Sequence, residues 1–272
     1  MDVEIEFERV LVESRNKTLN LASEHATRTG KYPVCEEPLY EFDVVDDMPE
    51  QDYWYYDDTS GKKLLDALVQ SARQEELGFV DRIGLWEVMD RPRDKRVIGT
   101  RWVDTNKGDE AHYNVRSRLV AQETKRKGTI EQFFAGTPPL SALKVLLSLA
   151  TTSRLPEIDP VRKARGRVLL QFFDVKKAHF WAQAERDLYV ELPEDYKMLH
   201  DIASDKVGKL RRSMYGMRDA AQLWEKTVAK ELTTLGFIRG WSNGCLFYHP
   251  VRDLRTSTHG DNFSSLGARQ DS

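Results

Sequence analysis

Charge and apolar periodicity divide this chain near residue 60, and the division limits where a folded core can form. Residues 1–60 carry 16 acidic and 5 basic side chains, whereas residues 61–272 carry 28 acidic and 36 basic ones. The formal net charge of −3 therefore hides an acidic head and a basic body. Mutual repulsion and little buriable surface predict a head that is linker-like and largely disordered. We expect a folded domain at 61–267, followed by a short tail at 268–272.

An aromatic cluster, Tyr53 to Tyr56, interrupts the acidic head. Two interpretations of this cluster remain open. Its rings could dock on the body or on a partner, or the segment could be a plain linker.

Composition and motif content exclude several classes of protein. At 272 residues and 40% apolar content the chain can bury a core, which argues against wholesale disorder. No stretch approaches the roughly 18 apolar residues of a membrane-spanning helix, and the acidic N-terminus does not resemble a signal peptide. Cys35 and Cys245 form neither a disulfide framework nor a metal site. We expect a soluble, intracellular protein with reduced thiols, in the cytoplasm or the nucleus.

The body mixes helical and strand-like patterns, which predicts an α+β fold with a largely antiparallel sheet. Helical spacing indicates one helix from about 62 to 77, a second capped by Ser141, and a third that stops at Gly236. Strand patterns occur at 85–89, 97–103, 113–121, 168–173, 188–192, 207–215, 245–248 and 254–258.

Basic side chains gather on a hairpin that we expect between residues 97 and 121. Residues 91–128 hold 11 basic and 5 acidic side chains. Alternation with a period of two places Arg116 and Arg118 on one face of the return strand, near Lys107 in the turn. A phosphate-binding surface and a merely solvated hairpin both account for this pattern.

Two aspartates at strand ends are the remaining candidates for chemistry, because zinc, phosphate-loop and nucleophile-elbow motifs are absent. Asp174 ends the apolar run 168–173, which is typical of a strand buried on both faces. Asp261 lies in a turn after the last predicted strand. By position alone, either residue could be an ordinary turn aspartate.

A series of short motifs follows in order along the body. The motifs are RWV at 101–103, RLVA at 118–121, FDVKKAHF at 173–180, LYVELP at 188–193, MYGMRDA at 214–220 with Trp224, GF at 236–237 and HGDN at 259–262. Together they resemble the reverse transcriptase domain of Ty1/copia-type retrotransposon polyproteins. Each motif is weak alone, and their order and spacing from about 62 to 267 carry the resemblance.

The resemblance implies a fingers and partial palm fold with RNA-directed DNA polymerase activity, a nucleotidyl transfer. It also implies an RNA or DNA template-primer and deoxynucleoside triphosphates as partners, a polyprotein or partner-chain context, and no membrane. Family members hold two Mg²⁺ ions, for which Mn²⁺ can substitute, between three palm carboxylates. Asp174 matches the first carboxylate and Asp261 the second, so both are the implied metal ligands.

Asn262 stands where the family has its third carboxylate. An amide offers one neutral oxygen, so we expect weaker Mg²⁺ binding and strongly reduced catalysis. The strand before His259 also lacks apolar residues, and the chain ends ten residues after Asn262. These departures predict a truncated, degenerate copy. A catalytically inert nucleic-acid-binding fragment, and an interaction module that uses the acidic head, are the alternatives.

The resemblance assigns nucleotide-binding roles to further residues. Lys107, Arg116 and Arg118 match the fingertip hairpin that contacts the incoming triphosphate. His179 falls where the family usually has Phe or Tyr, so exclusion of ribonucleotides is expected to weaken; a half-buried histidine without a role is the alternative.

Three more residues, Tyr215, Gly216 and Arg218, match the segment that lines the nucleotide and the template. Glycine there allows close approach of the backbone. A structural loop would account equally for Gly216 and Arg218.

Overall fold

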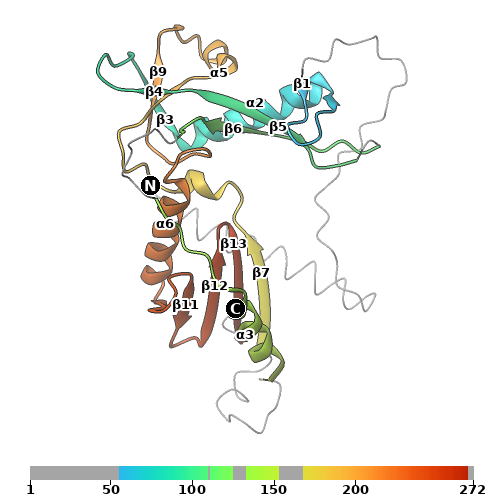
Figure 1. Cartoon of the computed structure of the whole chain (residues 1–272), viewed down its shortest axis with the longest axis vertical. Coiled ribbons are helices and arrows are strands. Elements are labelled where there is room, and N and C mark those ends of the chain that lie inside the picture. Colours follow the sequence, from blue (N-terminus) through green and yellow to red (C-terminus); the bar gives the residue numbers. More distant parts are fainter. Residues whose placement is uncertain (1–54, 110, 125–132, 153–167, 269–272) are drawn as a thin grey trace. The chain divides into compact units, whose positions relative to one another are not determined.

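The computed structural model describes residues 55–109, 111–124, 133–152 and 168–268 (Figure 1). The chain divides into two compact units, and every described helix and strand belongs to the unit formed by Tyr53–Asp109 and Tyr113–Ser272. Most of the acidic head, 1–54, and residues 269–272 of the predicted tail lie outside the described part, so the predicted disorder of the head stays a prediction.

One part of this unit combines a four-stranded sheet, a hairpin and a long helix. The elements are α2 (Asp66–Ile83), β3 (Trp86–Met89), β4 (Val97–Ile98), β5 (Thr100–Asn106), β6 (Val115–Ala121), β8 (Tyr189–Glu191) and β9 (Val207–Leu210). The sheet has the order β3-β9-β8-β4, and only β4 and β8 are parallel. Helix α2 contacts β6, and Leu77, Val80 and Leu119 share one buried core with Phe180.

A five-stranded antiparallel sheet forms the other part of this unit. Its order is β10-β11-β12-β13-β7. The strands are β7 (Val168–Asp174), β10 (Ile238–Arg239), β11 (Leu246–His249), β12 (Leu254–His259) and β13 (Asn262–Ala268). Helix α3 (Leu140–Thr152) contacts β7, β12 and β13, while α6 (Ala220–Thr234) contacts β10 and the short 3-10 helix η1 (Ala178–Trp181) (Figure 1).

The mixture of helices with mainly antiparallel sheets agrees with the predicted combination of α and β structure. A short helix, α5 (Glu194–Leu199), follows β8. Among the described residues, no helix is both long enough and apolar enough to cross a membrane.

The structure corrects the prediction that residues 55–60 are part of a disordered, linker-like head. Tyr55–Tyr56 form β1, which pairs with β2 (Lys63–Leu64), so α2 begins at Asp66, later than the predicted start near 62. The Asp57 carboxylate is buried and accepts backbone hydrogen bonds from Thr59 and Asn106. These bonds replace the lost hydration, and they hold the pKa of Asp57 below its usual value despite burial.

The prediction that the strand 168–173 is buried on both faces is wrong. Strand β7 lies at an edge of the sheet, and Phe172 is 63% exposed. Phe173 alone stacks on Phe263 of β13, with ring centroids 5.6 Å apart. An apolar run does not distinguish an edge strand with one open face from a central strand.

Two other local predictions differ from the structure. Ser141 lies inside α3 instead of capping it, and β9 ends at Leu210, well before the predicted 215. Strand β13 was not among the predicted strands. Its partner β12 buries Thr256, Ser257 and Thr258, and the Thr256 and Ser265 hydroxyls lie 2.7 Å apart. Hydrogen-bonded hydroxyls therefore replace the apolar packing that was expected there.

Candidate active site

Strand pairing brings the two candidate aspartates together at one end of the five-stranded sheet. Asp174, the last residue of β7, is the register partner of Asn262, the first residue of β13. Gly260 and Asp261 form the two-residue loop between β12 and β13, and Gly260 has φ 61°. Glycine in the first loop position suits a tight hairpin turn of this kind. The Val175 N–H donates to the Asp261 carbonyl over 2.8 Å, which closes the arrangement.

Trp224 holds this turn from behind. Its indole Nε1 donates to the Gly260 carbonyl over 2.7 Å, and the side chain is 2% exposed. Trp224 belongs to the buried face of α6. The helix therefore fixes the backbone that carries Asp261, a role that helical periodicity does not reveal.

The two carboxylates repel each other. Partial burial raises the pKa of Asp174, and the negative charge of Asp261 raises it further. Within the described ranges neither carboxylate has an ion pair, and no group of three or more His, Cys, Asp or Glu side chains could hold a metal. The Asn262 amide donates to Asp261 Oδ1 over 3.1 Å. Its nitrogen, not its oxygen, therefore faces the neighbouring carboxylate.

Uncompensated carboxylates at an exposed turn fit a divalent cation. Mg²⁺ is commonly held by one or two carboxylates, with water and substrate phosphates completing its shell. Asp174 and Asp261 supply that pair of hard oxygen donors at adjacent positions. A third anionic donor is missing at Asn262.

Tyr215 links the predicted nucleotide-binding residues. Its ring packs edge-on against both His179 and Phe180, with centroids 5.2 Å away in each case. The Arg118 guanidinium lies 5.5 Å from the centroid of the same ring. Burial raises the pKa of Tyr215 to about 12; positive Arg118 opposes this rise, and nearby carboxylates add to it. The phenol is therefore neutral at pH 7.

His179 sits in η1 with its ring half-buried. Burial lowers its pKa, so the imidazole is neutral at pH 7. Its Nδ1 is buried and has no hydrogen-bond partner among the described residues.

Gly216 is required by its surroundings. Its φ is 83°, and a Cβ at this position would lie 1.9 Å from the Ala121 carbonyl oxygen. The Ala121 N–H donates to the Tyr215 carbonyl over 2.7 Å, so the backbones touch at the end of β6. Glycine here joins the hairpin to the segment that carries Tyr215.

Arg218 lies in a separate polar network. Its N–H donates to Glu123 over 2.9 Å, and its guanidinium lies 5.1 Å from the Phe133 ring centroid. Arg186 binds both Glu123 and Asp219 through paired hydrogen bonds of 2.6 to 2.9 Å. Burial would raise the pKa of Glu123, but the bonds from Arg186 and Arg218 hold it below its usual value. Sequence reasoning missed this network, since its members are far apart in the chain.

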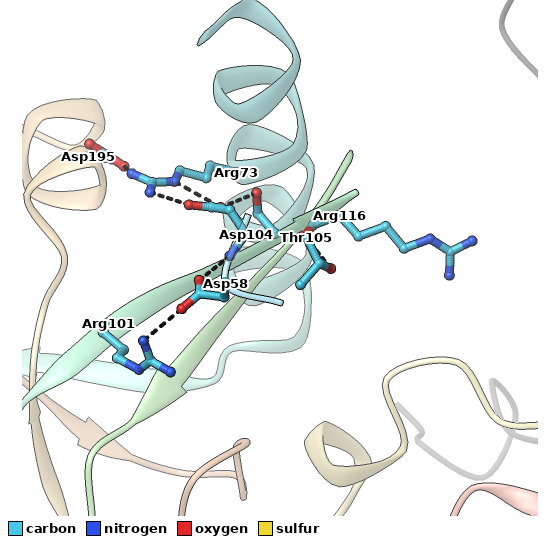
Figure 2. A network of polar contacts seen from close by, with 8 residues as sticks. Asp58, Arg73, Arg101, Asp104, Thr105, Arg116 and Asp195 are labelled. Carbon is cyan, nitrogen blue, oxygen red and sulfur yellow. Dashed lines mark hydrogen bonds and ion pairs between the residues drawn. The ribbon is translucent and has the colours of Figure 1, made fainter. Parts of the chain in front are cut away.

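The β5–β6 hairpin is anchored by a second set of charges, which we name the root cluster: Asp58, Arg73, Arg101, Asp104 and Asp195. Figure 2 shows Arg73 between Asp104 and Asp195, and Asp58 between the Asp104 backbone and Arg101. The Arg73–Asp104 distance is 2.6 Å. Arg116 points away from this cluster (Figure 2).

The predicted alternation of the return strand is confirmed. Ser117 and Leu119 are buried, whereas Arg116 and Arg118 are exposed. Lys107 is exposed in the turn, where its N–H donates to the Asn114 carbonyl over 2.8 Å. The structure thus gathers Asp174, Asp261, Asn262, His179, Tyr215 and Arg118 around one region. Among the described contacts, none joins Lys107, Arg116 or Arg218 to the two carboxylates.

A known protein family matches more than half of the chain. The family model "Reverse transcriptase (RNA-dependent DNA polymerase)" matches residues 83–252. Asp174, His179, Tyr215 and Arg118 lie inside the match, whereas Asp261 and Asn262 lie beyond it.

Several polyproteins of retrotransposons are similar to the chain. The Retrovirus-related Pol polyprotein from transposon TNT 1-94 of Nicotiana tabacum is 25% identical over 186 residues, or 66% of this chain and 13% of that protein. The transposon RE1 polyprotein of Arabidopsis thaliana is 22% identical over 60% of this chain and 10% of its own length. The Transposon Ty1-H Gag-Pol polyprotein of Saccharomyces cerevisiae is 25% identical over 56% and 8%. The chain thus spans only a small part of these relatives.

The family match covers more than half of the chain, and the polyproteins are of the Ty1/copia type that the motifs indicated. Members of this family generally depend on divalent metal ions, which is consistent with adjacent, unpaired carboxylates. The chain belongs to the reverse transcriptase (RNA-dependent DNA polymerase) family.

Proposed function

We propose that this chain forms the fingers and part of the palm of a Ty1/copia-type reverse transcriptase, and that Asn262 strongly reduces its activity. The proposed reaction is transfer of a deoxynucleotide to the 3′ hydroxyl of a primer paired with RNA or DNA. The observation that carries the proposal is the meeting of Asp174 and Asp261 where β7 pairs with β13. In a polyprotein, further segments would contribute to the same reaction.

Asp174 and Asp261 would hold the divalent cations of the proposed site, Mg²⁺ or Mn²⁺. Ions bound there would lower the pKa of the attacking hydroxyl and would stabilise the charge that develops on the triphosphate. Asn262 adds no charge, and its amide nitrogen occupies one side of Asp261. Two negative charges in place of three weaken the hold on a divalent cation.

The residues around Tyr215 would bind and orient the nucleotide. Arg118, exposed in the middle of strand β6, can neutralise phosphate charge, and Tyr215 supports its guanidinium. His179, neutral and packed edge-on against Tyr215, would face the sugar. Imidazole is smaller than the aromatic rings usual in the family, so we expect weaker exclusion of ribonucleotides. Lys107 and Arg116 would contact template or triphosphate from the same hairpin, and Arg218 would support the template side.

Primer extension on an RNA template tests the proposal directly. We compare the chain as it stands with Asn262→Asp, with Asp174→Asn in the Asn262→Asp background, and with the control Asp90→Asn, which changes a carboxylate 85% exposed elsewhere. Asn262→Asp should extend at least about tenfold faster, since one well-placed charge contributes on that scale. Asp174→Asn should abolish the gain, and Asp90→Asn should change nothing. Equal extension by the chain as it stands and by Asn262→Asp would contradict the role of Asn262.

A second candidate function is nucleic-acid binding without extension. It is favoured by the direct hydrogen bond from Asn262 to Asp261, which uses one oxygen of the carboxylate pair. Binding to a template-primer that weakens steeply with salt, with no extension by Asn262→Asp, would support this alternative. An interaction through the acidic head stays a prediction, because residues 1–54 lie outside the described part.

A further inference from the structure

One buried ion pair next to the candidate site has no part in the proposed chemistry. Glu76 of α2 and Lys177, three residues after Asp174, lie 2.6 Å apart through Oε2 and Nζ. Their side chains are 3% and 19% exposed. Glu76 lies outside the residues that the family model matches.

Two local features near this pair cost free energy in the folded state. Burying two charges requires their removal from water, and Glu76 Oε1 has no hydrogen-bond partner among the described residues. Lys177 has φ 56°, a left-handed conformation that side chains other than glycine and asparagine seldom adopt. A conformation of this kind persists where neighbouring contacts impose it.

The side-chain contacts of Lys177 with Glu76 and Phe79 come from α2. Lys177 Nζ lies 4.3 Å from the ring centroid of Phe79, in addition to its bond with Glu76. The same Phe79 ring packs on Phe180 and Trp181 of η1, with centroids 5.7 and 6.1 Å away. Lys177 is the N-cap residue, directly before η1. Helix α2 therefore holds both the start of η1 and its aromatic side chains.

We propose that Glu76 is a positioning residue, which holds Lys177 in its left-handed conformation and thereby sets the turn between Asp174 and His179. The inference rests on the proposed function, since it states how the chain aims two residues of that site. Only Val175 and Lys176 lie between Asp174 and Lys177, so a change at Lys177 reorients the end of β7 and the start of η1 together.

The kinetic test uses the full chain in the Asn262→Asp background. Glu76→Gln keeps the shape of the side chain and removes its charge, and Glu75→Gln makes the same change at an exposed position of the same helix. For Glu76→Gln we expect kcat for nucleotide addition to fall at least about tenfold, with KM for the nucleotide changing less than about threefold. Glu75→Gln should leave both constants unchanged.

Two variants of Lys177 separate positioning from general stability. Lys177→Gly permits φ 56° without strain and removes the ammonium group, so it should fold while lowering kcat to the level of Glu76→Gln. Adding Glu76→Gln to Lys177→Gly should lower kcat no further. With arginine in place of glycine, Lys177→Arg should keep most of the kcat of the Asn262→Asp background. A shift of the unfolding midpoint with kcat per folded molecule unchanged would show a purely structural pair and overturn the inference.

A spectroscopic test decides the inference without any activity. The Trp181 Nε1 donates to the Lys176 carbonyl over 3.2 Å, so this indole reports on the turn itself. With 5-fluorotryptophan in the full chain and the Trp181 resonance assigned by Trp181→Phe, Glu76→Gln should shift or broaden it, whereas Glu75→Gln should not. An unchanged resonance would overturn the inference. If Asn262→Asp fails to extend primers while Glu76→Gln still moves the resonance, the proposed function fails and the positioning of the turn stands.

Discussion

The root cluster and the carboxylate pair, Asp174 with Asp261, both contain aspartates, but only the aspartates of the root cluster have cationic partners among the described residues. In the root cluster, Asp104 is 4% exposed and accepts hydrogen bonds from Arg73 and from the Ser117 hydroxyl, the latter 2.6 Å long. Asp174 and Asp261 are exposed, lie next to each other, and have no cationic partner within the described residues. The protein itself supplies the partners of the Asp104 carboxylate, whereas the carboxylates of Asp174 and Asp261 are open to a cation from outside the protein.

This difference separates a structural charge from a candidate chemical one. A buried charge that has all its partners fixes the orientation of the elements it joins, here α2 and the β5–β6 hairpin. Adjacent like charges cost folding free energy, so the fold keeps Asp174 and Asp261 together against their mutual repulsion. That cost is recovered only when a cation binds, which is why this pair carries the proposed site.

The largest effect is expected when the buried carboxylate of the root cluster is removed. Asp104→Asn leaves Arg73, whose side chain is 15% exposed, without its main partner. Loss of one member of a buried ion pair should lower the free energy of unfolding by about 3–5 kcal/mol. Urea denaturation measures the change, with Asp90→Asn as the control because its ion pair with Lys206 lies at the surface. Equal unfolding midpoints for the two variants would show that Asp104 is not structural.

Some features of these two regions could be predicted from the sequence, and others could not. Alternation correctly placed Ser117 inside and Arg118 outside, since a period of two is a local property of a strand. The bond between Arg73 and Asp104 joins a helix to a strand, and no local pattern marks it. Strand β13 escaped prediction because Ser264, Ser265 and Gly267 give it few apolar residues, and pairing with β12 and β7 creates it.

The candidate site was predictable to the extent that motifs carry it. Asp174 and Asp261 were both chosen from strand ends, and the register of β7 with β13 places them together. The residues that hold them were not foreseen. Trp224 reads as an ordinary core residue of α6, and Glu76 reads as one more charge on α2, because their partners come from distant segments.

A smaller effect is expected from loosening the turn that carries Asp261. Trp224→Phe keeps an aromatic ring and removes the donor to the Gly260 carbonyl. The lost hydrogen bond and the smaller ring should lower the free energy of unfolding by about 1–2 kcal/mol. Urea denaturation gives this value. Amide exchange should quicken at Asn262 and Val175, which flank the turn, and should not change in β5 and β6. Uniform quickening across both regions would mean that Trp224 does not act through the turn.

The smallest expected effect has the opposite sign, because the substitution removes a repulsion between Asp174 and Asp261. Asp174→Asn removes one of two repelling charges, so it should raise the free energy of unfolding at pH 7 by about 0.5 kcal/mol or less, because the site is exposed and screened. Partial burial and the charge of Asp261 raise the pKa of Asp174 above its ordinary value in the folded chain, so the folded state binds the proton more tightly than the unfolded one. The difference between variant and parent should therefore be present above the folded pKa and shrink as the pH falls through it.

Urea denaturation from pH 7 down to pH 4 measures that difference. Divalent cation should reverse its sign: at millimolar Mg²⁺ or Mn²⁺ the parent gains stability by binding, and Asp174→Asn does not. Asp90→Asn, exposed beside Lys206, should respond to neither pH nor cation in this way. If Asp174→Asn destabilises the chain at pH 7 without any cation, Asp174 is held by the fold as Asp104 is, and the two regions do not differ in kind.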